Sequence, residues 1–272
     1  SSYNVGALFN KSGPCTYGWQ TPQVTDPFNP SVTKMGGTVA FVAMDGSGQL
    51  EALAYGAEKA VVWLEPGNLS AKHQEMVSSA PKHMLASDMT ADGLEDLIIT
   101  TSDMATDTVA IYPSKGSKNG FGLPASMNTG GVIHAVAAGL MDEDTRADVV
   151  LLTGPGGDGI KVLANPSTGL LAETSLTTAP SGELVDLAVG DLDQDGAMDV
   201  VAVRGNASGG VEVFRGDGLG KLSHALSMTT DGNGSRIQLA DMNGDGFLDI
   251  VIAHTWEGGS STDEISVVLA NP

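Results

Sequence analysis

The sequence repeats itself at an interval of about fifty residues. Two segments align without a gap, AVGDLDQDGAMDVVAV from Ala188 and QLADMNGDGFLDIVIA from Gln238, and a third, MLASDMTADGLEDLIIT, begins at Met84. Two weaker copies begin at Ala135 and Phe41. The last acidic residues of the five copies are spaced by 45, 52, 51 and 50 residues: Glu51, Asp96, Asp148, Asp199 and Asp249. A unit of this length is typical of one four-stranded propeller blade, whereas leucine-rich and tetratricopeptide units are much shorter.

Each repeat contains the patterns of several short strands. A first strand, as at residues 183–190 and 236–240, leads into an Asp-rich loop, and a nearly continuous apolar run such as residues 200–203 follows the loop. Such runs are typical of strands that are buried on both faces. An alternating third strand and a polar outer strand, as at residues 221–228, complete the unit. The sequence therefore predicts an all-β fold, a β-propeller of four-stranded antiparallel blades with about five countable repeats.

The two ends of the chain depart from this repeat. The last copy stops at ISVVLANP without an outer strand, while NVGALFNKSG from Asn4 and WQTPQVTDP from Trp19 have the patterns of third and fourth strands. We expect residues 1–36 to form a partial blade segment that could close the ring, and residues 37–272 to form the repeats. Either the closure is unusual, or the chain belongs to a longer array.

The charge of the chain is strongly negative. Thirteen Lys and Arg stand against 33 Asp and Glu, a net charge of −20. Nucleic acid is therefore not an expected partner, because phosphate backbones require a basic face. No membrane-spanning segment is expected, because no window approaches about 18 continuous apolar residues. Many of the aspartates fall at fixed spacing within the repeats, which indicates clustered cation sites rather than solubility alone.

Three loops have the residue spacing of calcium sites. In residues 191–199 and 241–249, oxygen-bearing side chains stand at positions 1, 3, 5 and 9, glycine stands at position 6, and position 7 offers its carbonyl. Hard oxygen donors in a flexible loop favour Ca²⁺ over zinc or copper. The loop at residues 88–96 has threonine at position 3 and should be weaker. The expected ligands of about three calcium sites are Asp88, Thr90, Asp92, Leu94, Asp96, Asp191, Asp193, Asp195, Ala197, Asp199, Asp241, Asn243, Asp245, Phe247 and Asp249.

Two further loops have lost part of this pattern. The loop at residues 140–148 has Leu140 at position 1 and Thr145 in place of the glycine, while the loop at residues 43–51 keeps fewer acids. Asp and Gly also favour ordinary turns that bind no metal, and this alternative is preferred for both loops. The possible weak ligands in the first of them are Asp142, Asp144 and Asp148.

The segments DLDQDGAMDVV, DMNGDGFLDIV and DMTADGLEDLI resemble the FG-GAP/VCBS repeats of integrin α-chain propellers and of many secreted proteins. The resemblance covers roughly residues 37–272. It implies a calcium-binding β-propeller in which the calcium loops brace the first and second strands, away from the usual ligand face. It also implies an extracellular or cell-surface location, and cell adhesion is one role within the family. The two altered loops and the absence of FG and GAP signatures depart from the family pattern.

Four N-x-S/T sequons are compatible with secretion and glycosylation: Asn10, Asn68, Asn206 and Asn233. No G-x-S-x-G, H-E-x-x-H or P-loop motif occurs, so we nominate no catalytic residue. His254 and Trp256 adjoin a Gly/Ser-rich loop of the last repeat and are possible ligand contacts, because an exposed aromatic ring can stack on a sugar or grip a peptide. The alternative is a tryptophan that folds over the edge of the blade.

Three functions remain open from the sequence. The favoured one is an extracellular, non-catalytic binding, adhesion or structural module whose partner is a protein, a glycan or a further copy of the chain. The second is the propeller domain of a secreted glycan-active enzyme. The third is the building block of an extracellular filament or surface assembly.

Overall fold

The computed structural model consists of β-strands and loops throughout the part of the chain that it describes. Before residue 81 it describes only the strands and residues 43–44. It also describes residues 81–270, except for short gaps. The gaps are residues 104–105, 117–118, 155, 158, 166–170, 181–182, 207–208, 231 and 256–263. Among the described residues, no helix is long and apolar enough to cross a membrane.

Four sheets contain four antiparallel strands each, in the order of the chain. Blade I consists of β5 (Val39–Val42), β6 (Glu51–Gly56), β7 (Ala60–Glu65) and β8 (Asn68–Met76). Blade II consists of β9 (Pro81–Ser87), β10 (Asp96–Asp103), β11 (Thr106–Tyr112) and β12 (Ala125–Asn128). Blade III consists of β13 (Ile133–Gly139), β14 (Asp148–Thr153), β15 (Gly159–Ala164) and β16 (Ala172–Thr178). Blade IV consists of β17 (Leu184–Gly190), β18 (Asp199–Arg204), β19 (Val211–Gly216) and β20 (Leu222–Met228).

The last sheet and the N-terminal strands are smaller. Blade V has three strands, β21 (Asn233–Ala240), β22 (Asp249–Thr255) and β23 (Glu264–Val268). Before blade I, β1 (Val5–Ala7) pairs with β4 (Gln23–Thr25), and β2 (Asn10–Lys11) pairs with β3 (Gly18–Trp19). Whether residues 1–36 close a ring stays a prediction.

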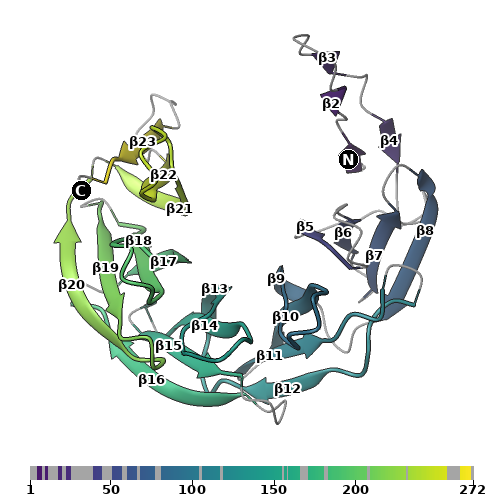
Figure 1. Cartoon of the computed structure of the whole chain (residues 1–272), viewed down its shortest axis with the longest axis horizontal. Helices are drawn as coiled ribbons and strands as arrows, with labels where there is room; N and C mark the ends of the chain where they lie inside the picture. Colours follow the sequence, from purple (N-terminus) through teal and green to yellow (C-terminus); the bar gives the residue numbers. More distant parts are fainter. Residues whose placement is uncertain are drawn as a thin grey trace.

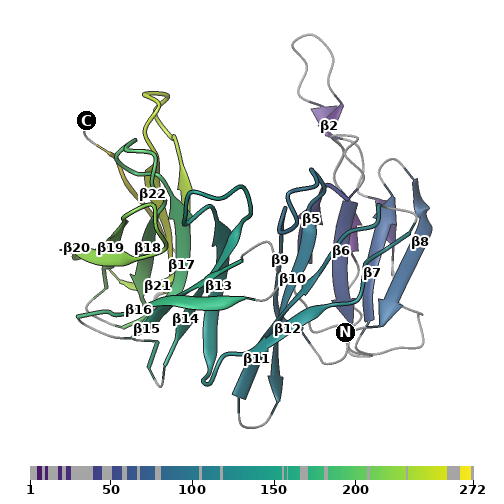
Figure 2. The same cartoon turned by 60° about the horizontal axis from the view of Figure 1, so that its bottom comes forward.

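The five sheets stand side by side around a common centre (Figure 1). The first strand of each blade is innermost and, in the four-stranded blades, the fourth is outermost. Figure 2 brings the outer strands β12 and β16 forward. The innermost strands β5, β9, β13, β17 and β21 contact one another in succession. The fold is therefore all-β and β-propeller-like, and Figure 1 shows an arc with blades I and V on either side of an opening.

The second strands of blades II, III and IV are largely buried because each lies between two neighbouring sheets. Every residue of β14 and of β18 is buried, which confirms the prediction made from their continuous apolar runs. The outer strand β20 is mostly exposed, as its polar sequence predicts. His254, which we expected just beyond a second strand, lies within β22, because its backbone pairs on both sides, with Gly234 and with Glu264.

The hydrophobic core is divided into clusters, one between each pair of adjacent blades. Successive residues of a second strand point to opposite neighbours. Leu97 and Ile99 pack in the cluster between blades I and II, whereas Ile98 packs with Val149 and Leu151 between blades II and III. Full burial of such a side chain contributes roughly 1.5–3 kcal/mol, so blades II, III and IV each depend on both of their neighbours for stability.

Candidate functional site

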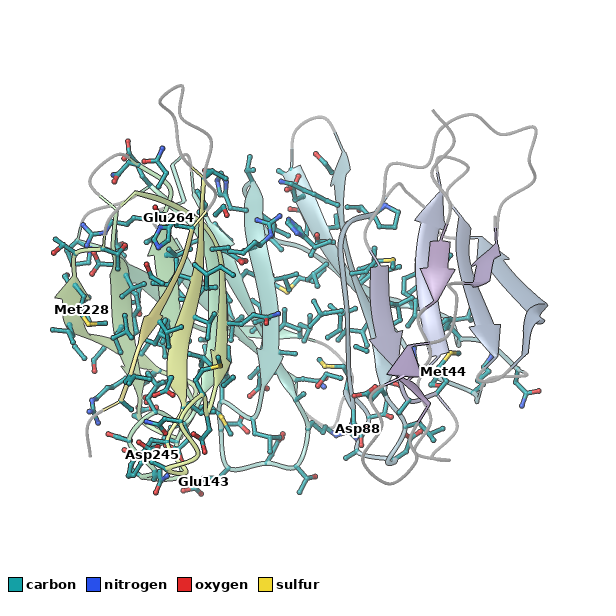
Figure 3. All side chains as sticks on the ribbon, turned by 90° about the horizontal axis from the view of Figure 1, so that it is seen from above. Met44, Asp88, Glu143, Met228, Asp245 and Glu264 are labelled. Carbon is teal, nitrogen blue, oxygen red and sulfur yellow. The ribbon has the colours of Figure 1, made fainter. Side chains whose placement is uncertain are left out.

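The Asp-rich loops lie on the same side of the arc in successive blades (Figure 3). Each joins the first strand of a blade to the second, and the blades share one orientation. Figure 3 accordingly shows Asp88, Glu143 and Asp245, which belong to three different loops, at the same end of the molecule and opposite Glu264. The repeated topology therefore produces a strongly acidic end.

The loop at residues 191–199 brings three carboxylates together. Asp191, Asp193 and Asp195 each offer an oxygen, and these atoms lie within 4.8 Å of one another. The loop coils tightly because Gln194 and Gly196 adopt left-handed backbone conformations, with φ of 61° and 92°. Asp191 Oδ2 accepts the N–H of Gly196 at 3.0 Å, whereas Asp191 Oδ1 is buried without a hydrogen-bond partner among the described residues. This oxygen-only set suits a hard cation.

The loop at residues 241–249 has the same backbone design. Gly244 and Gly246 adopt φ of 80° and 90°, and Asp241 Oδ2 accepts the N–H of Gly246 at 2.9 Å. That hydrogen bond is the main reason why the pKa of Asp241 lies below its usual value. Asp245 Oδ1 accepts the N–H of Phe247 at 2.9 Å, as Asp195 does from Ala197 in the preceding blade. The loop also contacts its neighbour, because Gln194 donates a side-chain N–H to the carbonyl of Gly246.

The loop at residues 88–96 follows this design despite its threonine. Ala91 and Gly93 are left-handed, and Asp88 Oδ2 accepts the N–H of Gly93 at 2.9 Å. Asp92 Oδ1 accepts the N–H of Leu94 at 2.9 Å. The Thr90 hydroxyl is buried without a hydrogen-bond partner among the described residues, so position 3 of this loop also holds an oxygen that could face a cation.

The altered loop at residues 140–148 has a different shape. Glu143 and Thr145, at positions 4 and 6, are not among the residues with positive φ. Thr145 replaces the glycine that adopts this conformation in the other three loops, and a β-branched residue disfavours it. Asp144 Oδ1 accepts the N–H of Arg146, and the Arg146 guanidinium donates to the carbonyl of Met89 in blade II. Cationic Arg146 is thus part of this acidic loop, in keeping with the preference for a metal-free turn.

The acid at position 9 serves as a brace in all four described loops. Its carboxylate is buried, and one oxygen accepts the N–H of loop position 2 while the other accepts an N–H just beyond or at the end of the third strand. The hydrogen bonds run from Met89 and Ser114 to Asp96, from Met141 and Asn165 to Asp148, from Leu192 and Gly216 to Asp199, and from Met242 and Ala270 to Asp249. Sequence reasoning assigned these acids only to the metal shell and missed this role.

Burial changes the titration of three of the bracing acids. It raises the pKa of Asp96 and Asp199, and it raises the pKa of Asp148 to about 6. A carboxylate oxygen can accept more than one interaction, so coordination of a cation by a bracing acid is compatible with its hydrogen bonds. That coordination stays a prediction.

A calcium ion fits the loop at residues 191–199 on electrostatic grounds. Carboxylates about 4 Å apart repel by about 1 kcal/mol per pair even in water, and the ion pair between Asp193 and Arg215 offsets only part of this repulsion. The side chains of Asp191, Asp193 and Asp195, with the carbonyl of Ala197, would hold the ion. Calcium would supply a cross-link between the first and second strands of the blade.

A second polar cluster, which the sequence did not reveal, lies on blade IV. Glu212 is fully buried beside Arg204, and its Oε2 lies 2.8 Å from His224 Nε2 and 2.5 Å from Ser227 Oγ. The serine hydroxyl is 3.2 Å from the same histidine nitrogen. In a nucleophilic triad the serine and the acid contact different ring nitrogens. This cluster is therefore arranged as a structural network between the third and fourth strands.

Of the two possible ligand contacts of the last repeat, the structure describes only His254. His254 is buried, and its Nε2 lies 2.9 Å from Ser266 Oγ on the neighbouring strand β23. Trp256 lies outside the described residues. Ligand contact at this loop stays a prediction.

The chain was compared with curated proteins, solved structures and protein-family models. No curated protein matches the chain. The fold is similar to that of BBS1N in a crystal structure of its complex with ARL6DN, soaked with lead, with a TM-score of 0.51 and 12% identity over 85% of this chain and 79% of that one. The mercury-soaked form of the same complex gives a TM-score of 0.49 at 12% identity, over 85% and 78% of the two chains. A family model, FG-GAP-like repeat, matches residues 141–202 and 191–252. The chain thus carries FG-GAP-like repeats, as its Asp-rich loops predicted.

Proposed function

We propose that this protein is a calcium-stabilised, non-catalytic propeller module that binds a protein partner outside the cell or at its surface. The observation that supports this most directly is the group formed by Asp191, Asp193 and Asp195 inside an FG-GAP-like repeat. Three acidic oxygens in a tight loop favour calcium over metals that prefer nitrogen or sulfur.

The exposure of the loops favours an extracellular role. The loop at residues 241–249 has exposed side chains at positions 1, 3 and 5, so water competes with the protein for the ion. Extracellular calcium modules commonly bind at about 10⁻⁴ to 10⁻³ M. Sites of this strength fill at the millimolar calcium of extracellular fluid.

The proposed mechanism is structural. Calcium at positions 1, 3, 5 and 7 ties the end of the first strand to the start of the second, and the bracing acid at position 9 ties the same loop to the end of the third. The innermost and outermost strands then present rigid surfaces to a partner. A protein partner is proposed by analogy, since BBS1N was crystallised with the protein ARL6DN.

Thermal unfolding with and without calcium tests the metal proposal. For a site with a Kd of about 1 mM, about 10 mM calcium adds roughly 1.4 kcal/mol. In a chain of this size that corresponds to a rise in Tm of roughly 2–4 °C per site. Asp195→Ala and Asp245→Ala should each remove part of the calcium-dependent rise.

Asp217→Ala is the matched control. Asp217 is exposed and also accepts two backbone N–H groups in a turn, from Leu219 and Lys221, but it lies outside the Asp-rich loops. Its replacement should leave the calcium response unchanged. A wild-type Tm that is the same in chelator and in 10 mM calcium, or an equal loss of response in the control, would contradict the proposal.

A further inference from the structure

The last blade exposes a row of apolar side chains. Met242, Ile265 and Val267 are 56%, 73% and 43% exposed, and Val251 and Ala253 beside them are partly exposed. They occupy loop position 2, the second strand and the third strand of blade V. We call these five residues the terminal face.

The same positions are covered in blades II, III and IV. The strand register establishes the equivalence, because Ala253 pairs with Ile265 as Val203 pairs with Val211 in blade IV. All the equivalent side chains are buried except that of Leu192, which is partly buried: Met89, Ile98, Thr100, Val109 and Ile111 in blade II; Met141, Val150, Leu152, Ile160 and Val162 in blade III; Leu192, Val201, Val203, Val211 and Val213 in blade IV.

In each case the following blade covers these positions. In blade III, Ile160 and Val162 pack in one cluster with Leu184, Leu187 and other residues of blade IV. In blade IV, the equivalent residues pack with Ile237, Ile250 and Ile252 of blade V. The terminal face thus continues an interface that the molecule forms three times, and the surface that fits it is the opposite face of another blade.

We propose that the terminal face binds blade I of a second copy of this chain. Blade I is the one blade in the arc that has no preceding blade (Figure 1). Ala52 and Ala54 of its second strand occupy the register positions of Leu97 and Ile99, which pack against the preceding blade in blade II. Within one chain, β5 of blade I and β21 of blade V lie on either side of the opening. The N-terminal strands pair with each other, β1 with β4 and β2 with β3.

Such an association is head-to-tail, because two different surfaces meet. The net charge of −20 opposes it, so added salt should strengthen it by screening the repulsion. This inference goes beyond the proposed function and does not depend on calcium binding.

Sedimentation of the full chain tests the association. The wild type should show a mass that rises with concentration, and Ile265→Lys should weaken association by roughly tenfold or more, as expected for a charge placed in a buried interface. Leu176→Lys, on the outer strand β16 and of similar exposure at 57%, is the matched control and should associate like the wild type. An unchanged Tm for both variants shows that the fold is intact.

Cysteine pairs identify the occupant. In a Cys15→Ser background, mixing Ala54→Cys chains with Val267→Cys chains should give disulfide-linked dimers across the proposed contact. A wild type that stays monomeric at all concentrations and salt levels overturns the proposal. A disulfide within one chain of the doubly substituted variant also overturns it, because that result means that blade V packs on blade I of its own chain.

Discussion

Replacement of Asp199 by alanine measures the bracing role of the position-9 acid. Asp199 is 2% exposed, and its carboxylate accepts N–H groups from Leu192 at 3.1 Å and from Gly216 at 3.0 Å. Alanine leaves both amides without an acceptor. A buried donor that loses its partner costs roughly 1–3 kcal/mol, which gives roughly 2–6 kcal/mol for the two. Burial already raises the pKa of Asp199, so alanine also relieves a desolvation cost, and we expect the lower part of this range.

The assay is urea unfolding in chelator and again in calcium. In chelator, Asp199→Ala should lose about 2–3 kcal/mol of unfolding free energy, because the brace does not involve the ion. Asp195→Ala is the comparison: its side chain is exposed and accepts a single N–H, from Ala197. It should lose less than about 1 kcal/mol in chelator and more in calcium.

The reasoning is refuted if Asp199→Ala and the wild type unfold at the same urea concentration in chelator. It is also refuted if the whole loss appears only in calcium, since Asp199 would then act as a ligand alone. An unchanged m-value is the control that both proteins unfold to the same extent.

Two further predictions concern the buried carboxyl of Asp148 and the turn at Gly157. The pKa of Asp148 is about 6 in the folded state and 3.8 in the reference state, so the Asp148 carboxyl binds a proton more tightly in the folded protein than in the unfolded one. The wild type should therefore gain up to about 3 kcal/mol relative to Asp148→Asn as the pH falls from 7 to 4, and a difference independent of pH contradicts this. Gly157→Ala should destabilise by more than about 3 kcal/mol, because a Cβ would lie 2.0 Å from a backbone carbonyl oxygen, whereas Gly196→Ala meets no atom within 4 Å and should cost about 1 kcal/mol of backbone strain. Equal losses in denaturant unfolding would contradict the second prediction.

Much of the fold follows from the sequence because its signals are local and repeated. Continuous apolar runs such as residues 200–203 predict strands buried on both faces, and β18 is buried throughout. The D-x-D-x-D-G spacing and its D-x-N-x-D-G variant predict a coiled loop, and the left-handed backbone at Gly196 and Gly246 confirms it. Each of these features needs only a few consecutive residues, so pattern alone is sufficient.

Other features depend on which segments meet in space. Asp199 becomes a brace because the end of β19 comes beside the loop, and Glu212 meets His224 only through the pairing of β19 with β20. Met89 and Met242 stand at the same loop position in nearly identical motifs, yet Met89 is buried and Met242 is exposed. The difference is the blade that follows: the hydrophobic effect acts on area removed from water, and a neighbouring sheet decides how much is removed.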